Sequence, residues 1–90
     1  MHNKVKLRQE FESFRNKKAI KYAEMERLAK LLGRTIKKRG KHPTWVNSEF
    51  PELRPLSIPH HGHGGVLVDN TANNILNQLE EDMIKIEESK

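Results

Sequence analysis

The chain contains no cysteine, and this absence rules out disulfides and thiolate metal sites. Aromatic residues are only 6% of its 90 residues and hydrophobic residues only 34%, so a modest core is all that can form. No apolar run approaches the length of a membrane span or of a signal-peptide core. The sequence therefore predicts one small domain, and we expect it to be soluble and cytoplasmic.

Charge, in contrast, is abundant and unevenly distributed. Charged residues make up 32% of the chain, and the net charge is +5. Residues 1–45 contain 14 Lys and Arg against 4 Asp and Glu, whereas residues 46–90 contain 3 against 8. Such an asymmetry suggests one surface for a polyanion and another for a protein partner or solvent. Composition does not distinguish RNA from DNA or from an acidic protein.

Three stretches repeat apolar residues at helical spacing, and each predicts an amphipathic helix. The first covers residues 4–16. The second ends at Gly33, since glycine accepts a positive φ just beyond a helix end without strain. The third begins where Asp69 or Asn70 can cap it. The three apolar stripes are Leu7, Phe11 and Phe14; Tyr22, Met25, Leu28, Ala29 and Leu32; and Ala72, Ile75, Leu76, Leu79, Met83 and Ile86.

The two terminal helices each raise a question about what covers them. The stripe of the first helix has no obvious place in a small core, so we expect it to contact a partner protein or a second copy of the chain. The last helix ends in Glu87 and Glu88, and negative charge there opposes the helix dipole. We therefore expect that end either to fray or to meet a basic surface.

Two short runs with β-like alternation flank Gly40 and predict a tight hairpin over residues 34–39 and 42–47. Pro43 has no N–H to donate, so the second strand either lies at an edge there or begins after it. A third short strand is predicted over residues 55–59. The predicted order is helix, three strands and helix, preceded by an N-terminal helical segment, which places the chain in the α+β class.

The hairpin combines the two kinds of side chain that phosphodiester chemistry uses. Five cations lie in residues 34–41, and His42 follows the turn directly. Cations hold an anion, and an imidazole transfers protons near neutral pH. The alternative is a surface hairpin with a solvated basic edge and a half-buried histidine.

A second histidine-rich segment lies in the loop of residues 60–65. His60, His61 and His63 suggest a metal site, but no carboxylate or cysteine adjoins them, and the glycines between them leave them unoriented. Metal sites need a fixed ligand set with a supporting second shell. We therefore predict no metal and no other cofactor.

From about residue 22 to about residue 79 the order of these motifs resembles the HicA family, the toxins of HicA/HicB toxin–antitoxin pairs. A leucine-rich helix ending in Gly33 is followed by a basic strand, by Gly40-Lys41-His42 and by an aromatic residue at Trp45. A third strand ending Ser57-Ile58-Pro59-His60, a glycine-bearing loop and the helix Asn70 to Leu79 complete the series. Lys41 stands where the family has serine, and Pro43 where a polar residue or histidine is frequent.

The resemblance implies a fold like a double-stranded-RNA-binding domain, α-β-β-β-α, with two helices on one face of an antiparallel sheet. It also implies metal-independent endoribonuclease activity on mRNA, with His42 as the catalytic residue and a HicB-like antitoxin as the partner. The HicA-like domain would cover residues 19–83, with an N-terminal helical extension at 1–18 and an acidic C-terminal tail at 84–90. Self-association through the N-terminal helix is a further expectation.

Metal-free RNA cleavage gives each candidate residue a role. His42 is the candidate base, and His60 is either a second catalytic residue, the acid, or a histidine that only shapes its turn. Trp45 either stacks on a base or belongs to the core. The candidate RNA phosphate ligands are Lys37, Lys38, Arg39 and Lys41.

Two other classes of function compete with this hypothesis. One is a non-catalytic RNA-binding module that uses the same basic face and tolerates the loss of His42. The other is an interaction protein whose amphipathic helices bind a partner, which would depend on the stripe of the first helix.

Overall fold

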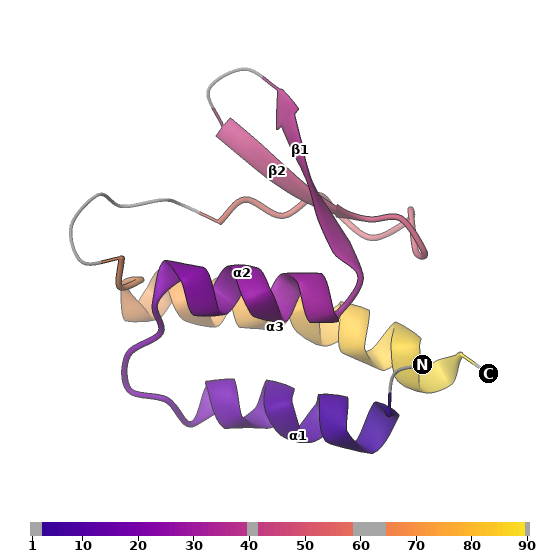
Figure 1. Cartoon of the computed structure of the whole chain (residues 1–90), viewed down its shortest axis with the longest axis horizontal. Coiled ribbons are helices and arrows are strands. Elements are labelled where there is room, and N and C mark those ends of the chain that lie inside the picture. Colours follow the sequence, from indigo (N-terminus) through magenta and orange to yellow (C-terminus); the bar gives the residue numbers. More distant parts are fainter. Residues whose placement is uncertain (1–2, 40–41, 59–64, 90) are drawn as a thin grey trace.

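In the computed structural model, which describes residues 3–39, 42–58 and 65–89, the chain is a small α+β protein. Figure 1 shows α2 in front of α3, α1 below them, and a two-stranded hairpin rising above the helices. The elements follow in the order α1 (Lys4–Arg15), α2 (Tyr22–Leu31), β1 (Arg34–Arg39), β2 (His42–Asn47) and α3 (Asp69–Glu88).

Helix α1 begins at an asparagine cap and buries the whole of its apolar stripe. The side chain of Asn3 accepts hydrogen bonds from the backbone N–H groups of Val5 (3.0 Å) and Lys6 (3.2 Å), which satisfies donors that a helix start leaves free. Leu7, Phe11 and Phe14 all lie in the hydrophobic core, and Phe11 is 0% exposed. The helix was predicted correctly, but the expectation that its stripe contacts a partner protein or a second copy is wrong, because the chain covers that stripe itself.

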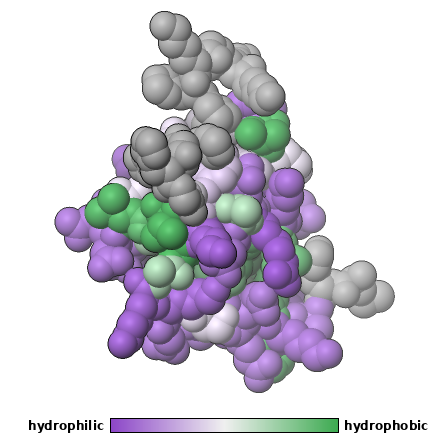
Figure 2. Space-filling view, turned by 60° about the vertical axis from the view of Figure 1, so that its left-hand side comes forward, coloured by the Kyte–Doolittle hydropathy of each residue, from purple (hydrophilic) through white to green (hydrophobic). Residues whose placement is uncertain are grey.

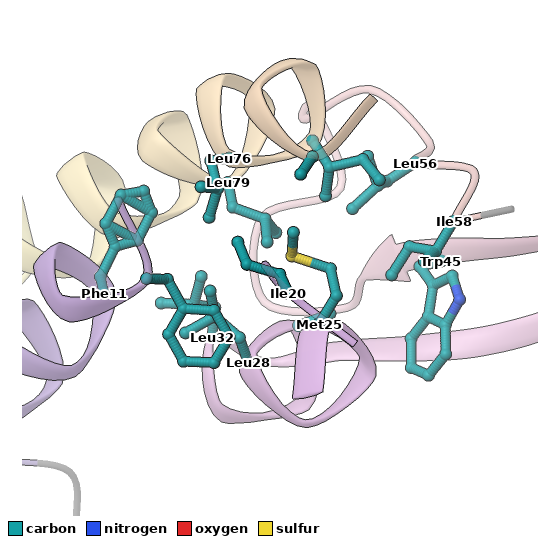
Figure 3. Packing of buried hydrophobic residues seen from close by; sticks show 14 of the residues in the cluster. Phe11, Ile20, Met25, Leu28, Leu32, Trp45, Leu56, Ile58, Leu76 and Leu79 are labelled. Atoms are coloured by element: carbon teal, nitrogen blue, oxygen red, sulfur yellow. The ribbon is translucent and has the colours of Figure 1, made fainter. Parts of the chain in front are cut away.

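The core receives side chains from all three helices, from β2 and from the segments that connect them. Figure 3 shows Phe11 of α1, Met25 of α2, Trp45 of β2 and Leu79 of α3 packed in one cluster. Burying a side chain of leucine or phenylalanine size stabilises the folded state by roughly 1.5–3 kcal/mol. Since α1 shares this cluster with α2 and α3, it is part of the folded unit.

Helix α2 ends as the glycine predicts. The N–H of Gly33 donates to the carbonyl of Lys30 (3.0 Å), and Gly33 has a φ of 96°. A Cβ at this position would also stand 3.4 Å from Oδ1 of Asn47. The chain can therefore turn sharply from α2 into β1 at Gly33, with the end of β2 close by.

The predicted hairpin is confirmed, but the third strand is not. Strands β1 and β2 pair antiparallel from Arg34 opposite Asn47 to Arg39 opposite His42, which leaves two residues for the turn. Leu56 meets Trp45 in a single bridge with bonds of 2.7 and 2.8 Å. In the next hydrogen-bonded rung Ile58 would lie opposite Pro43 of β2, and a proline has no N–H to donate to it. Within residues 42–58 the pairing therefore stops at one residue, and the described sheet has two strands.

Helix α3 differs from expectation at both ends. Its N-cap is Val68, which forms no side-chain cap bond, so the prediction that Asp69 or Asn70 caps it is wrong. At the other end the helix continues through residue 84 to Glu88, so most of the predicted acidic tail is helical. Glu87 there pairs with Arg8 of α1, and the expected meeting with a basic surface is thereby confirmed. No helix within residues 3–39, 42–58 and 65–89 combines the length and the apolar character needed to cross a membrane.

Candidate nucleic-acid interface

The basic hairpin, residues 34–47, carries most of the candidate site residues. Its register sets Lys37 opposite Thr44, Lys38 opposite Pro43 and Arg39 opposite His42. In Figure 1 the paired strands rise from the helices toward the turn. The ladder thus brings the backbone of the candidate base directly opposite that of a candidate phosphate ligand. Lys41, His60 and the side chains of Lys38, Arg39 and His42 lie outside the described residues.

The two faces of the hairpin have different surroundings, as the alternation of side chains along a strand requires. Trp45 and Asn47 are buried against the rest of the protein, whereas Thr35 and Lys37 are exposed on the opposite face. A groove of about 280 Å³ lies along this outer face, between the strands and the loop of residues 48–55. Lys37 and Val46 line it together with Leu53 of that loop. The outer face therefore offers an exposed cation beside a concave surface.

Trp45 belongs to the core, which is one of the two alternatives that the sequence left open, and the other, base stacking, is wrong for this arrangement. The residue is 0% exposed, and its ring lies within the hydrophobic cluster (Figure 3). The ammonium of Lys30 in α2 lies 5.8 Å from the centre of the indole ring, within the range of a cation–π contact. The indole Nε1 has no acceptor among the described residues. A nucleobase cannot reach a ring that is enclosed in this way.

One of the five cations of the basic stretch is buried and paired. Arg34 is 2% exposed, and its guanidinium donates to both carboxylate oxygens of Asp82 at 2.8 Å. Its Nη1 also donates to the carbonyls of Trp45 and Arg54, each at 2.8 Å. Arg34 is therefore removed from the set of cations that could meet a phosphate. Sequence reasoning missed this pair because its members are 48 positions apart and Arg34 stands at the start of a basic run.

The same pattern holds for several other cations of the N-terminal half. The ion pairs that join residues 1–45 to acidic residues of residues 46–90 are Arg8–Glu80, Arg8–Glu87, Arg15–Glu80 and Arg34–Asp82. Lys17 and Arg27 pair with carboxylates of their own half. The predicted asymmetry of charge is present in the sequence. In the folded chain, part of the positive charge of the first half is balanced by carboxylates of the second half, mainly where α1 lies against α3.

The cations left for a ligand can now be identified. In the part of the chain that the structure describes, the exposed cations with no carboxylate within ion-pair distance are Lys6, Lys18, Lys21, Lys30, Lys37 and Arg54. Lys37 lies on the hairpin, and Lys30 lies beside it above Trp45. Arg54 follows Leu53 of the groove, and its carbonyl accepts from Arg34 at the base of the hairpin. Lys37, Lys30 and Arg54 are therefore the described cations near the hairpin that an anionic ligand can use.

Ion pairs and burial shift the pKa of several side chains in the described residues. The Arg8 guanidinium holds the pKa of Glu87 below its usual value, and the Lys17 ammonium does the same for Glu24. Burial, followed by the charge of Glu26, raises the pKa of Tyr22. These three groups lie on the helices, so they bear on stability and not on the chemistry of the hairpin.

The histidine-rich loop falls outside the described residues, but the segments on both sides of it are well anchored. Ile58 is buried before it, and the N–H of Leu67 donates to the carbonyl of Ile20 (2.8 Å) after it. Val66 and Lys21 form a further bridge between the same two segments. Residues 3–39, 42–58 and 65–89 contain no group of three His, Cys, Asp or Glu arranged to hold a metal ion.

In comparisons with known proteins, no family model, no curated protein and no solved structure matches the chain. The resemblance to HicA toxins therefore remains a prediction from the sequence motifs. Any function has to be supported by the hairpin and its surroundings.

Proposed function

We propose that this protein is an endoribonuclease that binds RNA through the basic hairpin and cleaves it with His42 as the general base. The observation that carries the proposal is the register of the hairpin, in which His42 pairs directly with Arg39 beside the turn. This pairing joins a group that titrates near neutral pH to a permanent cation at one end of a two-stranded ladder. A phosphodiester held there would have a base and a counter-ion from the same pair of the ladder.

Three properties of the hairpin support RNA as the ligand. Lys37 is exposed without a carboxylate partner in the described residues, so its charge is available to a phosphate. The groove of about 280 Å³ lies beside Lys37 and gives a nucleotide a concave surface to enter. The last pair of the ladder, Arg39 with His42, also lies at the end of β1 and β2 away from the helices (Figure 1). Contacts of this kind read backbone and shape more than sequence.

The proposed reaction uses the 2′-hydroxyl of the RNA as its nucleophile. His42 takes the proton from that hydroxyl, and the 2′-oxygen then forms a bond to the adjacent phosphorus. The bond from phosphorus to the 5′-oxygen breaks, and an acid protonates that oxygen, a role for which His60 is the candidate. A positioned imidazole accelerates such a step by roughly two to four orders of magnitude. Cations beside the phosphate stabilise the charge that develops on it.

The HicA-like order of motifs supports a biological context for this activity. We propose that the protein is the toxin of a type II toxin–antitoxin pair, that mRNA is its substrate and that a HicB-like protein neutralises it. The hypothesis of a pure interaction protein loses its main support, because Leu7, Phe11 and Phe14 are buried within the chain. A non-catalytic RNA-binding module on the same hairpin is the alternative to be tested.

The test is a comparison of His42→Gln and His42→Ala with the unmodified chain. Glutamine retains size and hydrogen bonding but cannot titrate, so we expect cleavage of RNA and growth arrest to be lost in both variants. The affinity for RNA should change less than about threefold, because the cations remain. His2→Gln, which alters a histidine outside the hairpin, is the matched control. Full activity of both His42 variants would remove His42 from the mechanism, and binding without any cleavage by the unmodified chain would favour the binding module.

A further inference from the structure

Arg34, Asn47 and Asp82 form a buried polar cluster at the base of the hairpin. Arg34 and Asp82 are the most enclosed charged residues of the described chain, 2% and 0% exposed, and Asn47 is 2% exposed. One carboxylate oxygen of Asp82 accepts from both Nε of Arg34 (2.8 Å) and Nδ2 of Asn47 (3.0 Å). Since Arg34 begins β1 and Asn47 ends β2, a single carboxylate of α3 holds both strands of the hairpin.

The cluster also reaches every other segment that meets the hairpin at its base. Nδ2 of Asn47 donates to the carbonyl of Leu32 at the end of α2 (3.0 Å), and its Oδ1 accepts from the N–H groups of Glu49 (3.0 Å) and Phe50 (3.3 Å). Through Nη1, Arg34 binds the carbonyl of Arg54 (2.8 Å). The polar cluster therefore connects α2, α3, both strands and the loop of residues 48–55.

The geometry of these bonds restricts the orientation of the hairpin in a way that the core cannot. Apolar packing of Trp45 has no direction and tolerates small rotations. A bidentate pair between a planar guanidinium and a carboxylate fixes distance and angle together. A two-stranded hairpin has little stability of its own in water, and within the described residues only Leu56 adds a rung to it. The direction in which the hairpin points must therefore come from its base.

We infer that the Arg34–Asp82 pair positions the basic hairpin for catalysis, so that both residues are positioning residues of the proposed nuclease. This inference rests on the proposed function. A rotation at Arg34 is carried along the ladder to Arg39 and His42 at its far end, and a displacement of a reacting group by about 1 Å can reduce a rate up to about a hundredfold. The cations of the hairpin still meet RNA after such a rotation, since phosphate contacts tolerate small shifts. Loss of the pair should therefore lower the cleavage rate far more than the affinity.

The test uses the full chain with Arg34→Lys, which retains the buried charge but not the bidentate pair. A double variant, Arg34→Met with Asp82→Leu, replaces both charges by apolar groups of similar volume, and such replacements usually leave a protein folded. Glu52→Gln is the control, because Glu52 pairs with Lys85 of α3 (3.3 Å) at the surface of the same region. Folding is monitored by circular dichroism, and RNA affinity and the cleavage rate at saturating RNA are measured separately.

A second measurement does not depend on activity. Hydrogen exchange of the Trp45 and Leu56 amides reports on the hairpin, and exchange of the Leu67 amide reports on a distant bond to Ile20. We expect exchange at Trp45 and Leu56 to rise at least tenfold in both variants, with less than threefold change at Leu67. The cleavage rate should fall at least tenfold while RNA affinity changes less than threefold, and Glu52→Gln should resemble the unmodified chain.

Two results would overturn the positioning role. One is an unchanged cleavage rate in both variants, and the other is an equal rise of exchange at all three amides, which marks a general loss of stability. If the unmodified chain itself does not cleave RNA, the proposed function fails. The inference about catalysis fails with it, while the exchange data still decide whether Arg34 and Asp82 orient the hairpin.

Discussion

Arg8 of α1 forms a bidentate ion pair with Glu87 in the last turn of α3, and so joins the two ends of the chain. Nε of Arg8 donates to one carboxylate oxygen of Glu87 at 3.0 Å and Nη2 donates to the other. The same guanidinium binds Glu80 at 2.7 Å. The carboxylate of Glu87, which would oppose the dipole at the end of α3, is thus balanced by a cation from another helix.

The burial of the α1 stripe leads to a prediction about stability. Phe11→Ala should lower the free energy of unfolding by about 3–5 kcal/mol, because it removes a fully buried ring and leaves a cavity. Small domains have total stabilities of roughly 5–15 kcal/mol, so deletion of residues 1–17 should leave a chain that does not fold. Urea unfolding followed by circular dichroism measures both effects.

The control for this prediction is Gln9→Ala, at an exposed position of the same helix. It should change the stability by no more than about 0.5 kcal/mol. A truncated chain that still unfolds in one cooperative transition would show that α1 is dispensable for the fold.

The Arg8–Glu87 pair predicts a dependence of stability on pH. Arg8 lowers the pKa of Glu87 in the folded protein from the ordinary value of 4.5. A depressed carboxylate contributes stability that is present above pH 4.5 and is lost as the pH falls through the lower folded value. Glu87→Gln should therefore be less stable than the unmodified chain at about pH 7 and should lose less stability on acidification. The pair is partly exposed, so screening limits the effect to about 1 kcal/mol or less.

Thermal unfolding across this pH range measures the prediction. Glu88→Gln is the matched control, because Glu88 is exposed and has no ion-pair partner in the described residues. Parallel pH profiles for the unmodified chain and Glu87→Gln would show that the pair contributes nothing to acid sensitivity.

The features that sequence predicted correctly depend on neighbouring residues. The hairpin follows from alternation on both sides of Gly40, and the end of α2 follows from Gly33, whose φ of 96° suits glycine alone. The helices follow from apolar spacing over a few turns. Such signals act over short stretches of chain, so a single sequence contains them.

The features that sequence missed depend on contacts between distant segments. The Arg34–Asp82 pair and the burial of the Phe11 ring are both decided by which elements pack together. The residues next to an arginine in the sequence do not show whether it is buried or solvated. An apolar stripe likewise does not show which surface covers it. The absent third strand is an intermediate case, because Pro43 is visible in the sequence, but its effect on this pairing depends on the register between β2 and residues 55–58.

The distinction between ion-paired and unpaired cations predicts which of them contribute to RNA affinity. Lys37→Ala should weaken binding to single-stranded RNA and reduce the slope of log K against log salt by about 0.7, because one phosphate contact is lost. Lys37 is exposed on the hairpin and has no carboxylate partner among the described residues. Lys6→Ala is the matched control, because Lys6 is also an exposed lysine but lies on α1, on the far side of the helices from the hairpin (Figure 1).

Another part of the surface is hydrophobic. Figure 2 shows hydrophobic side chains gathered on the face of the molecule that turns forward from the left of Figure 1. Val66 and Val68, which lie just before α3, are 43% and 62% exposed. Equal slopes for Lys37→Ala and Lys6→Ala would mean that RNA contacts the protein away from the hairpin, and this face would then be the next one to alter.

The proposed mechanism makes a final prediction about the products and about metal. The nucleophile is the 2′-oxygen of the RNA, so cleavage should leave a 2′,3′-cyclic phosphate on one fragment and a 5′-hydroxyl on the other. The reaction assigned to His42 transfers protons and requires no metal-bound water, so activity should survive an excess of EDTA. A DNA oligonucleotide, or RNA with a 2′-methoxy group at the cleaved position, should bind without being cut. Mass spectrometry of the fragments identifies the ends. Fragments with a 5′-phosphate, together with loss of activity in EDTA, would contradict the 2′-hydroxyl mechanism and transfer the chemistry to a metal held by His60, His61 and His63.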